Sequence, residues 1–264
     1  MKVGFIGCGN MGSAMIRGIL SAGKCTAAEL MASARTPGTR QRITQELGIG
    51  CGSNREVAAF SQVLVLAVKP VFYEEVISQV RDAAAPDTLI VSIAPGKTID
   101  ALREMWGGVP RKIIRAMPNT PALVGECMAG MCASEEVTDE ECAVVRELFE
   151  CFGRCEMVPE RLMDVVTGIS GSSPAYMFMI LEAMADGAVA DGMPRAQAYR
   201  FAAQAMLGSA ALALETGKHP GELKDMVCSP GGTTIEAVRI LEEKGLRSAM
   251  MEAVMGCDRK ARTM

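Results

Sequence analysis

Two glycine-containing turns carry the residues of this chain that could do chemistry. The first, Gly7-x-Gly9-x-x-Gly12, lies between a short apolar run and an apolar pattern of helical length. In such a turn the glycines permit a tight bend and a close approach of backbone to a pyrophosphate, and the next helix offers free N–H groups to the phosphate oxygens. This context predicts dinucleotide binding. The alternative is a plain glycine-rich turn.

The second turn, Pro230-Gly231-Gly232, precedes Thr233 and Thr234 and a helix predicted to reach about residue 244. The N–H groups of Gly232, Thr233 and Thr234 could bind a carboxylate, which leaves the Thr234 hydroxyl free to hydrogen-bond a second atom. Thr233 and Glu236 also have the spacing of a capping box. The alternative reading is therefore that these threonines only cap a helix.

The end of the second predicted strand indicates which dinucleotide binds. An NAD site places an acidic residue there for the ribose 2′-hydroxyl, whereas an NADP site offers arginine and hydroxyl groups to a 2′-phosphate. The sequence is Ser33-Ala34-Arg35-Thr36, without an acid, and Glu29 lies at the wrong end of the strand. We therefore expect NADP(H), with Arg35 at the 2′-phosphate; an ordinary polar loop is the alternative.

Short apolar runs predict the sheet that positions these turns. Apolar strands are expected at 3–6, 29–33, 62–68, 88–93, 112–117 and 154–158. Several are apolar on both faces, as buried parallel strands are, and the loops after them lie where open α/β sheets bind ligands. The fold class is α/β plus all-α: an N-terminal Rossmann doubly wound sheet (residues 1–161), followed by a C-terminal helical oligomerisation domain (162–264).

The second half reads as helix throughout. Segments 173–190 and 194–214 are apolar nearly all round, so each needs burial on several sides. They are not membrane spans, because Glu182, Asp186 and Arg200 interrupt them. We expect faces buried in a second subunit; one compact bundle is the alternative.

Charge and cysteine content give no support for a nucleic-acid, membrane or metal partner. Lys plus Arg number 27 against 31 Asp plus Glu, a balance that gives no reason to expect nucleic acid or an anionic membrane as partner. With one histidine and no Cys-x-x-Cys pair, we expect no metal site. The sequence starts directly on a strand, without a charged leader, so the ten cysteines are expected to be reduced thiols in the cytoplasm.

At the motif level the chain resembles the pyrroline-5-carboxylate reductase family. The most specific stretch runs from Pro220 through Val227-Cys228-Ser229-Pro230-Gly231-Gly232-Thr233-Thr234 to Glu242. The opening turn, the loop Ala67-Val68-Lys69-Pro70, the loop 117–121 and the segment 171–176 also resemble the family, so the similarity covers essentially the whole chain.

The resemblance implies an NAD(P)H-dependent reductase that converts 1-pyrroline-5-carboxylate to L-proline, the last step of proline biosynthesis. NADP(H) is the expected cofactor, with NAD(H) as the alternative, and the expected assembly is a homodimer, often five dimers in a decamer. Thr233 and Thr234 resemble substrate contacts, with Thr234 beside the imine nitrogen. The expected cofactor contacts, combining the resemblance with the turn and strand-end arguments, are Ile6, Gly7, Cys8, Gly9, Asn10, Met11, Gly12, Ser33, Arg35, Thr36, Asn54, Ala67, Val68, Lys69, Pro70, Ile93, Ala94 and Pro95.

The chemistry needs few special groups. A protonated iminium is already electrophilic, so a hydride donor in line with carbon suffices and no Lys or His acid is required. A threonine hydroxyl is a weak acid, so Thr234 is assigned a hydrogen bond to nitrogen, or the relay of a proton from water. One rival is a β-hydroxyacid dehydrogenase, but no lysine occurs between Lys112 and Lys218 to serve as its catalytic lysine. The other is a non-catalytic NADP sensor.

Overall fold

The computed structural model describes residues 1–263. Cα packing separates the chain into two units: residues 1–172 together with the final segment from Met255, and residues 173–254. The turns between residues 160 and 172 pack with the first unit, so packing divides the chain later than the predicted 161/162 boundary. That boundary stays a prediction about which residues serve cofactor binding and which serve assembly.

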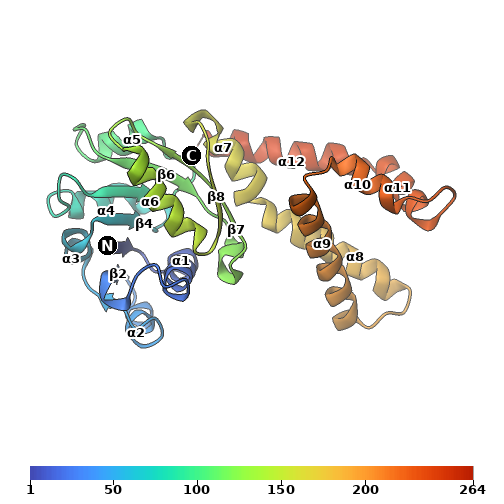
Figure 1. Ribbon diagram of the computed structural model, residues 1–264, viewed down its shortest axis with the longest axis horizontal. Helices are drawn as coiled ribbons and strands as arrows, with labels where there is room; N and C mark the ends of the chain where they lie inside the picture. The colour runs from blue at the N-terminus through green and yellow to red at the C-terminus, as the bar shows by residue number, and fades with distance from the viewer. Residues whose placement is uncertain (264) are drawn as a thin grey trace. The chain divides into compact units, whose positions relative to one another are not determined.

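The first unit is built on one eight-stranded sheet (Figure 1). Its order is β3-β2-β1-β4-β5-β6-β7-β8, and every neighbouring pair is parallel except β6 with β7. The strand order reverses at β1, between β2 and β4, which is the switch point where doubly wound sheets bind ligands. The strands are β1 (Val3–Ile6), β2 (Leu30–Ser33), β3 (Gly50–Cys51), β4 (Val63–Leu66), β5 (Leu89–Ser92), β6 (Ile113–Met117), β7 (Cys127–Ala133) and β8 (Gly153–Met157).

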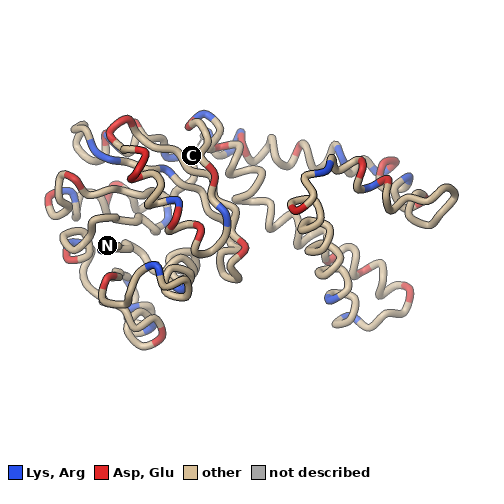
Figure 2. The backbone as a smooth tube through the Cα atoms, in the orientation of Figure 1, with Lys and Arg blue, Asp and Glu red and all other residues tan. Residues whose placement is uncertain are grey.

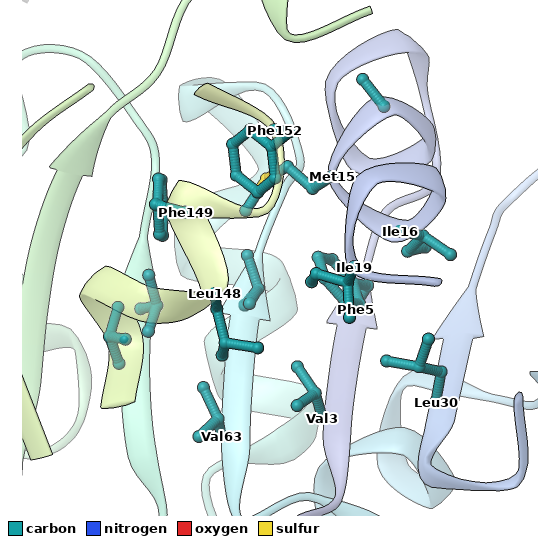
Figure 3. Packing of buried hydrophobic residues seen from close by; sticks show 14 of the residues in the cluster. Val3, Phe5, Met15, Ile16, Ile19, Leu30, Val63, Leu148, Phe149 and Phe152 are labelled. Carbon is teal, nitrogen blue, oxygen red and sulfur yellow. The ribbon is translucent and has the colours of Figure 1, made fainter. Parts of the chain in front are cut away.

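Helices cover both faces of this sheet. They are α1 (Asn10–Ser21), α2 (Pro37–Gln45), α3 (Asn54–Phe60), α4 (Tyr73–Val80), α5 (Ile99–Met105), α6 (Asp139–Glu150) and the short α7 (Met163–Val166). Consecutive residues of β4 point to opposite sides: Val63 joins the buried cluster under α1 and α6, whereas Leu64 joins the cluster under α4 and α5. Figure 3 shows the first cluster, with Phe149 and Phe152 packed near Met15.

Strand β7 was not predicted from the sequence, although its neighbour β6 was. The sequence of β7, Cys-Met-Ala-Gly-Met-Cys-Ala, contains none of the β-branched residues that mark strands. Small residues are needed because α7 packs on the strand: a Cβ on Gly130 would lie 2.8 Å from a Val166 methyl group. The close approach of α7 therefore favours small residues in β7 over the bulky β-branched residues usual in strands.

The second unit is helical, as predicted. Its helices are α8 (Ser173–Ala190), α9 (Arg195–Thr216), α10 (Pro220–Val227), α11 (Thr233–Glu243) and α12 (Leu246–Ala261), the last of which ends in the first unit. Helix α8 packs on α9, yet Phe178 is 65%, Phe201 62% and Leu214 64% exposed in the single chain. No helix within residues 1–263 is long and apolar enough to cross a membrane.

Candidate active site

The glycine turn follows β1 directly and has the geometry of a phosphate-binding turn. Gly7 has a φ of 95°, and its N–H donates to the Ser33 carbonyl at 3.1 Å. A Cβ on Gly12 would lie 2.6 Å from the Gly7 carbonyl oxygen, so only glycine lets α1 begin this close to the strand. Around Gly9 no atom would lie within 4 Å of an added Cβ. The turn is therefore tight on its inner side and open at Gly9, where a phosphate needs access.

The first turn of α1 suits an anion. Gly9 is its N-cap residue and no side chain caps the helix, so the terminal N–H groups are not taken by a cap. No Asp or Glu occupies this first turn. The Cys8 thiol faces inward, 3.3 Å from the Ser13 hydroxyl, and burial raises the pKa of Cys8. Cys8 is therefore a neutral thiol that fills space behind the turn.

The end of β2 brings together two predicted contacts that are far apart in sequence. The Ser33 hydroxyl donates to Asn54 Oδ1 at 2.6 Å, and Asn54 Nδ2 donates to Gln79 Oε1 at 2.7 Å. Ser33 is buried and Asn54 half-buried, so Asn54 is the more accessible of the two. Thr36 caps α2 by accepting the Thr39 N–H, so its hydroxyl is already engaged within the protein.

Arg35 is exposed and is held by an aromatic ring rather than by an acid. Its guanidinium carbon lies 5.3 Å from the centre of the Phe72 ring, in the 3₁₀ turn η2 (Pro70–Phe72) that follows β4. A guanidinium over the face of an aromatic ring uses none of its N–H groups in that contact, so they are free to bind phosphate oxygens. The geometry is compatible with the predicted 2′-phosphate role, which stays a prediction.

A pocket of about 290 Å³ lies at the carboxyl ends of β4, β5 and β6. It unites the three loops predicted to form the cleft. Several lining residues were not among the predicted contacts, although the loop 117–121 was expected at this edge. The pocket is lined by Met11, Ala67, Val68, Lys69, Ile93, Ala94, Pro95, Met117, Pro118, Asn119, Thr120 and Gly171.

Asn119 gives this pocket a fixed wall. Its Nδ2 donates to the Ser170 carbonyl at 3.0 Å, and its Oδ1 accepts the Met128 N–H at 3.1 Å. The side chain thereby ties the loop after β6 to β7 and to the π-helical turn η5 (Thr167–Gly171), which supplies Gly171 to the lining. In the sequence, Asn119 is only an asparagine in a loop after a strand. Asparagine is common in turns of every kind, so this pattern did not single out its role.

A larger hollow, of about 1000 Å³, lies at the opposite edge of the sheet, among Lys2, Gln62 and Thr88. These residues precede β1, β4 and β5, so the hollow faces the amino ends of the strands. It has no glycine turn and no helix N-terminus over a switch point. We therefore place the candidate site at the carboxyl edge.

The threonine turn belongs to the second unit. The Gly232 N–H donates to the Ser229 carbonyl at 3.0 Å and Gly231 has a φ of 68°, which makes 229–232 a turn of the Pro-Gly type. Because the Gly232 N–H is used inside the turn, the donors that remain for a carboxylate are those of Thr233 and Thr234.

The capping box that the spacing of Thr233 and Glu236 allowed as an alternative does not form. Helix α11 begins at Thr233 itself, with Gly232 as N-cap and no side-chain cap, and Glu236 binds Arg239 at 2.8 Å instead. Within residues 1–263 neither the Thr233 nor the Thr234 hydroxyl is engaged by another group. The reading in which these threonines only cap the helix is thereby removed, and the exposed Thr233 and half-buried Thr234 are available to a ligand.

Within residues 1–263 there is no cluster of three or more His, Cys, Asp or Glu side chains that could hold a metal ion. The ten cysteines are free thiols. The polar groups described above are backbone N–H groups, hydroxyls, the Arg35 guanidinium, and the Lys69 and Asn119 side chains that line the pocket.

Comparison with known families matches both halves of the chain. Residues 160–264 match the model described as pyrroline-5-carboxylate reductase dimerisation. Residues 2–96 match the model described as NADP oxidoreductase coenzyme F420-dependent. The second unit therefore lies within a dimerisation region and the glycine turn within an NADP oxidoreductase region.

Individual relatives and solved structures that align with nearly the whole chain point to the same family as the family models. A pyrroline-5-carboxylate reductase of Escherichia coli is 51% identical over 261 residues, 98% of this chain and 97% of its own. One from Methanosarcina acetivorans is 42% identical over 268 residues, 100% of this chain and 97% of its own. The NADP-bound pyrroline carboxylate reductase of Plasmodium falciparum has a TM-score of 0.89 at 30% identity and covers 100% of this chain and 97% of its own. The Coxiella burnetii enzyme has a TM-score of 0.91 at 30% identity and covers 99% and 97%. With such identity along the whole chain, this protein belongs to the pyrroline-5-carboxylate reductase family.

Proposed function

We propose that this protein reduces the C=N bond of 1-pyrroline-5-carboxylate to give L-proline, the last step of proline biosynthesis, with NADPH as the preferred hydride donor and NADH as the alternative. The observation that carries the proposal is the 51% identity to the Escherichia coli reductase over 98% of the chain. The unengaged threonines at the start of α11 and the open phosphate turn after β1 supply the chemistry that such a reaction needs.

The residues present fit a nicotinamide dinucleotide. Gly9 leaves the turn open to phosphate, and the exposed Arg35 offers its guanidinium to a 2′-phosphate. The pocket at the carboxyl edge, about 290 Å³, is of a size to take one end of a small-molecule ligand and would hold the nicotinamide. When bound, NADPH supplies the hydride that reduces the imine carbon.

The threonine turn is assigned to the substrate. The N–H groups of Thr233 and Thr234, at the positive end of α11, would bind the substrate carboxylate. The Thr234 hydroxyl would hydrogen-bond the ring nitrogen and hold it in one orientation; relay of a proton from water through the same hydroxyl is the alternative. Neither role needs a lysine or histidine, which agrees with the lack of lysine between 112 and 218.

The test is turnover with the cyclic imine. Thr234→Ala is expected to lower kcat by about a hundredfold, the usual worth of a hydrogen bond to a reacting atom, with NADPH affinity little changed. Thr216→Ala is the matched control, because that hydroxyl donates to the Leu212 carbonyl within α9, at 2.7 Å. Unaltered turnover in Thr234→Ala removes this residue from the mechanism. NADPH binding without oxidation of NADPH by the imine in the unmodified protein would identify a non-catalytic sensor instead.

Assembly and location complete the proposal. The dimerisation region and the exposed apolar residues of α8 and α9 indicate a homo-oligomer, and we propose a dimer that assembles further into a decamer. We also propose a cytoplasmic location, supported by ten cysteines that are all unpaired, as in a reducing compartment. Light scattering of the purified protein would measure the assembly.

A further inference from the structure

The segment between Glu29 and Glu46 carries positive charge without negative charge, and it includes the end of β2, where the cofactor is expected to bind. Between Glu29 and Glu46 the sequence has no Asp or Glu and three arginines: Arg35, Arg40 and Arg42. This segment contains β2, the loop after it and α2, next to the switch point at β1. Figure 2 shows where Lys and Arg (blue) and Asp and Glu (red) fall along the chain.

Each of these arginines is held by a neutral group. Arg35 stacks on Phe72. Arg40 Nε donates to the Ala34 carbonyl at 2.7 Å, which anchors its guanidinium one residue beyond the end of β2. Arg42 Nη2 donates to the Cys8 carbonyl at 2.6 Å and to the Ser13 hydroxyl at 3.1 Å, so it contacts the phosphate turn and the first turns of α1.

Carboxylates close to the segment are engaged elsewhere. Glu29 binds the chain's amino terminus, Glu46 binds Arg17 at 3.0 Å, and Glu56 accepts the Ser53 N–H at 2.7 Å in a capping box. None of the three arginines has an ion-pair partner within residues 1–263. The Arg42 Nε is moreover buried with no hydrogen-bond partner. Arg35 and Arg40 are exposed and therefore solvated, so their charge is free to meet an anion from solvent, whereas the partly buried Arg42 leaves one donor unsatisfied, which costs free energy.

We propose that Arg40 and Arg42 are cofactor-binding residues with different tasks. Arg40 is anchored at the carbonyl of Ala34, the residue before Arg35, at the end of β2 where the ribose 2′-substituent is read, so we assign both arginines to the 2′-phosphate of NADPH. Arg42 contacts the turn that cradles the pyrophosphate and stabilises that group, which NADPH and NADH share. The inference rests on the proposed use of NADPH and names the residues that set its preference over NADH.

The two tasks give different binding patterns. In Arg40→Gln the dissociation constant for NADPH is expected to rise about tenfold, as for the loss of one charge-assisted contact, while that for NADH stays unchanged. In Arg42→Gln both constants are expected to rise by a similar factor, with the ratio preserved. Arg42→Lys keeps the charge and should recover part of the loss. Fluorescence titration of the full-length protein measures both constants without turnover.

Arg154→Gln is the matched control. It makes the same charge change on β8, at the other end of the sheet, where the exposed side chain of Arg154 has no ion-pair or hydrogen-bond partner within residues 1–263. Neither dissociation constant should change in this variant.

Two further readouts separate binding from a structural role. The melting temperature of the cofactor-free protein should not fall in Arg40→Gln, because one of three unpaired like charges is removed. NADPH binding should also depend less on salt in that variant, because one guanidinium–phosphate contact is lost. An Arg40→Gln variant that binds NADPH normally, or that weakens NADPH and NADH equally, overturns the assignment of Arg40. A change in NADPH affinity alone in Arg42→Gln overturns that of Arg42. Failure of the unmodified protein to bind either dinucleotide refutes the proposed function instead.

Discussion

Arg115 offers the sharpest test of how the site is supported. It lies on β6, its side chain is 3% exposed, and Nη2 contacts Asp164 Oδ1 at 2.6 Å while Nη1 lies 3.5 Å from Glu160 Oε1. Glu160 also accepts the Ile99 N–H at 2.7 Å. These two contacts of Arg115 connect the turn η4 (Glu160–Leu162) and α7 to β6. The end of β6 supplies Met117 to the pocket.

Replacing Arg115 by methionine keeps an unbranched apolar stem and removes the guanidinium and its charge. Asp164 is 19% exposed and would lose its partner, whereas Glu160, at 36%, is better solvated and keeps its backbone donor. The penalty therefore comes mainly from one poorly solvated carboxylate. Breaking such a pair costs about 3–5 kcal/mol of unfolding free energy, which is a large part of the total for a typical domain.

Urea unfolding, followed by fluorescence of the single tryptophan, Trp106, measures this cost, because that side chain is 1% exposed in the same unit. The double variant Arg115→Met/Asp164→Leu replaces the pair by two apolar side chains and should be more stable than Arg115→Met alone. Arg103→Met is the control: its side chain is 29% exposed, and the loss should be less than about 1 kcal/mol. An Arg115→Met variant as stable as the control, or a double variant no better than the single one, would refute this reasoning.

Three more outcomes are expected. Gly12→Ala should weaken NADPH binding and lower the unfolding free energy by about 1–3 kcal/mol, because the new Cβ would lie 2.6 Å from the Gly7 carbonyl oxygen and the turn must open; titration and urea unfolding measure the two effects. Thr138→Ala should cost about 1 kcal/mol in urea unfolding, because the capping box at the start of α6 is lost. Burial raises the pKa of Cys132 and of Cys155 to about 12 from an ordinary value of 9.0, so the folded state holds these protons more tightly than the unfolded state. Their contribution to stability is complete below pH about 9 and is lost as the pH rises toward about 12, which unfolding at a series of alkaline pH values would detect; Cys132→Ala/Cys155→Ala should flatten that decline.

Much of the candidate site could be predicted from local patterns. The glycine spacing after an apolar run specified the phosphate turn, and the lack of an acid after Ser33 specified a site suited to NADP. Both predictions work because the signal lies within a few consecutive residues, where backbone geometry and side-chain type are tied directly to sequence. The buried parallel strands β1, β4 and β5 were predicted for the same reason.

Other features depend on contacts between distant residues. Strand β7 has Gly130 where Val166 packs closely against it, a contact that no local pattern encodes. A local competition can also go against the pattern: Thr233 and Glu236 have the spacing of a capping box, yet Glu236 pairs with Arg239 three residues further along α11 and the cap does not form. Such local alternatives differ by only about 1 kcal/mol, so a competing ion pair is enough to decide between them.

The sequence by itself determined the family, the two-part α/β and helical architecture and the residue types that meet phosphate and substrate. Only the tertiary structure decided that Arg40 and Arg42, from α2, are held at Ala34 and Cys8 without acidic partners. It also decided that Asn119 ties the pocket wall together. The physical reason is that a motif is read from neighbours in the chain, whereas an unpaired charge or a shared hydrogen bond is defined by which groups folding brings within about 3 Å of one another.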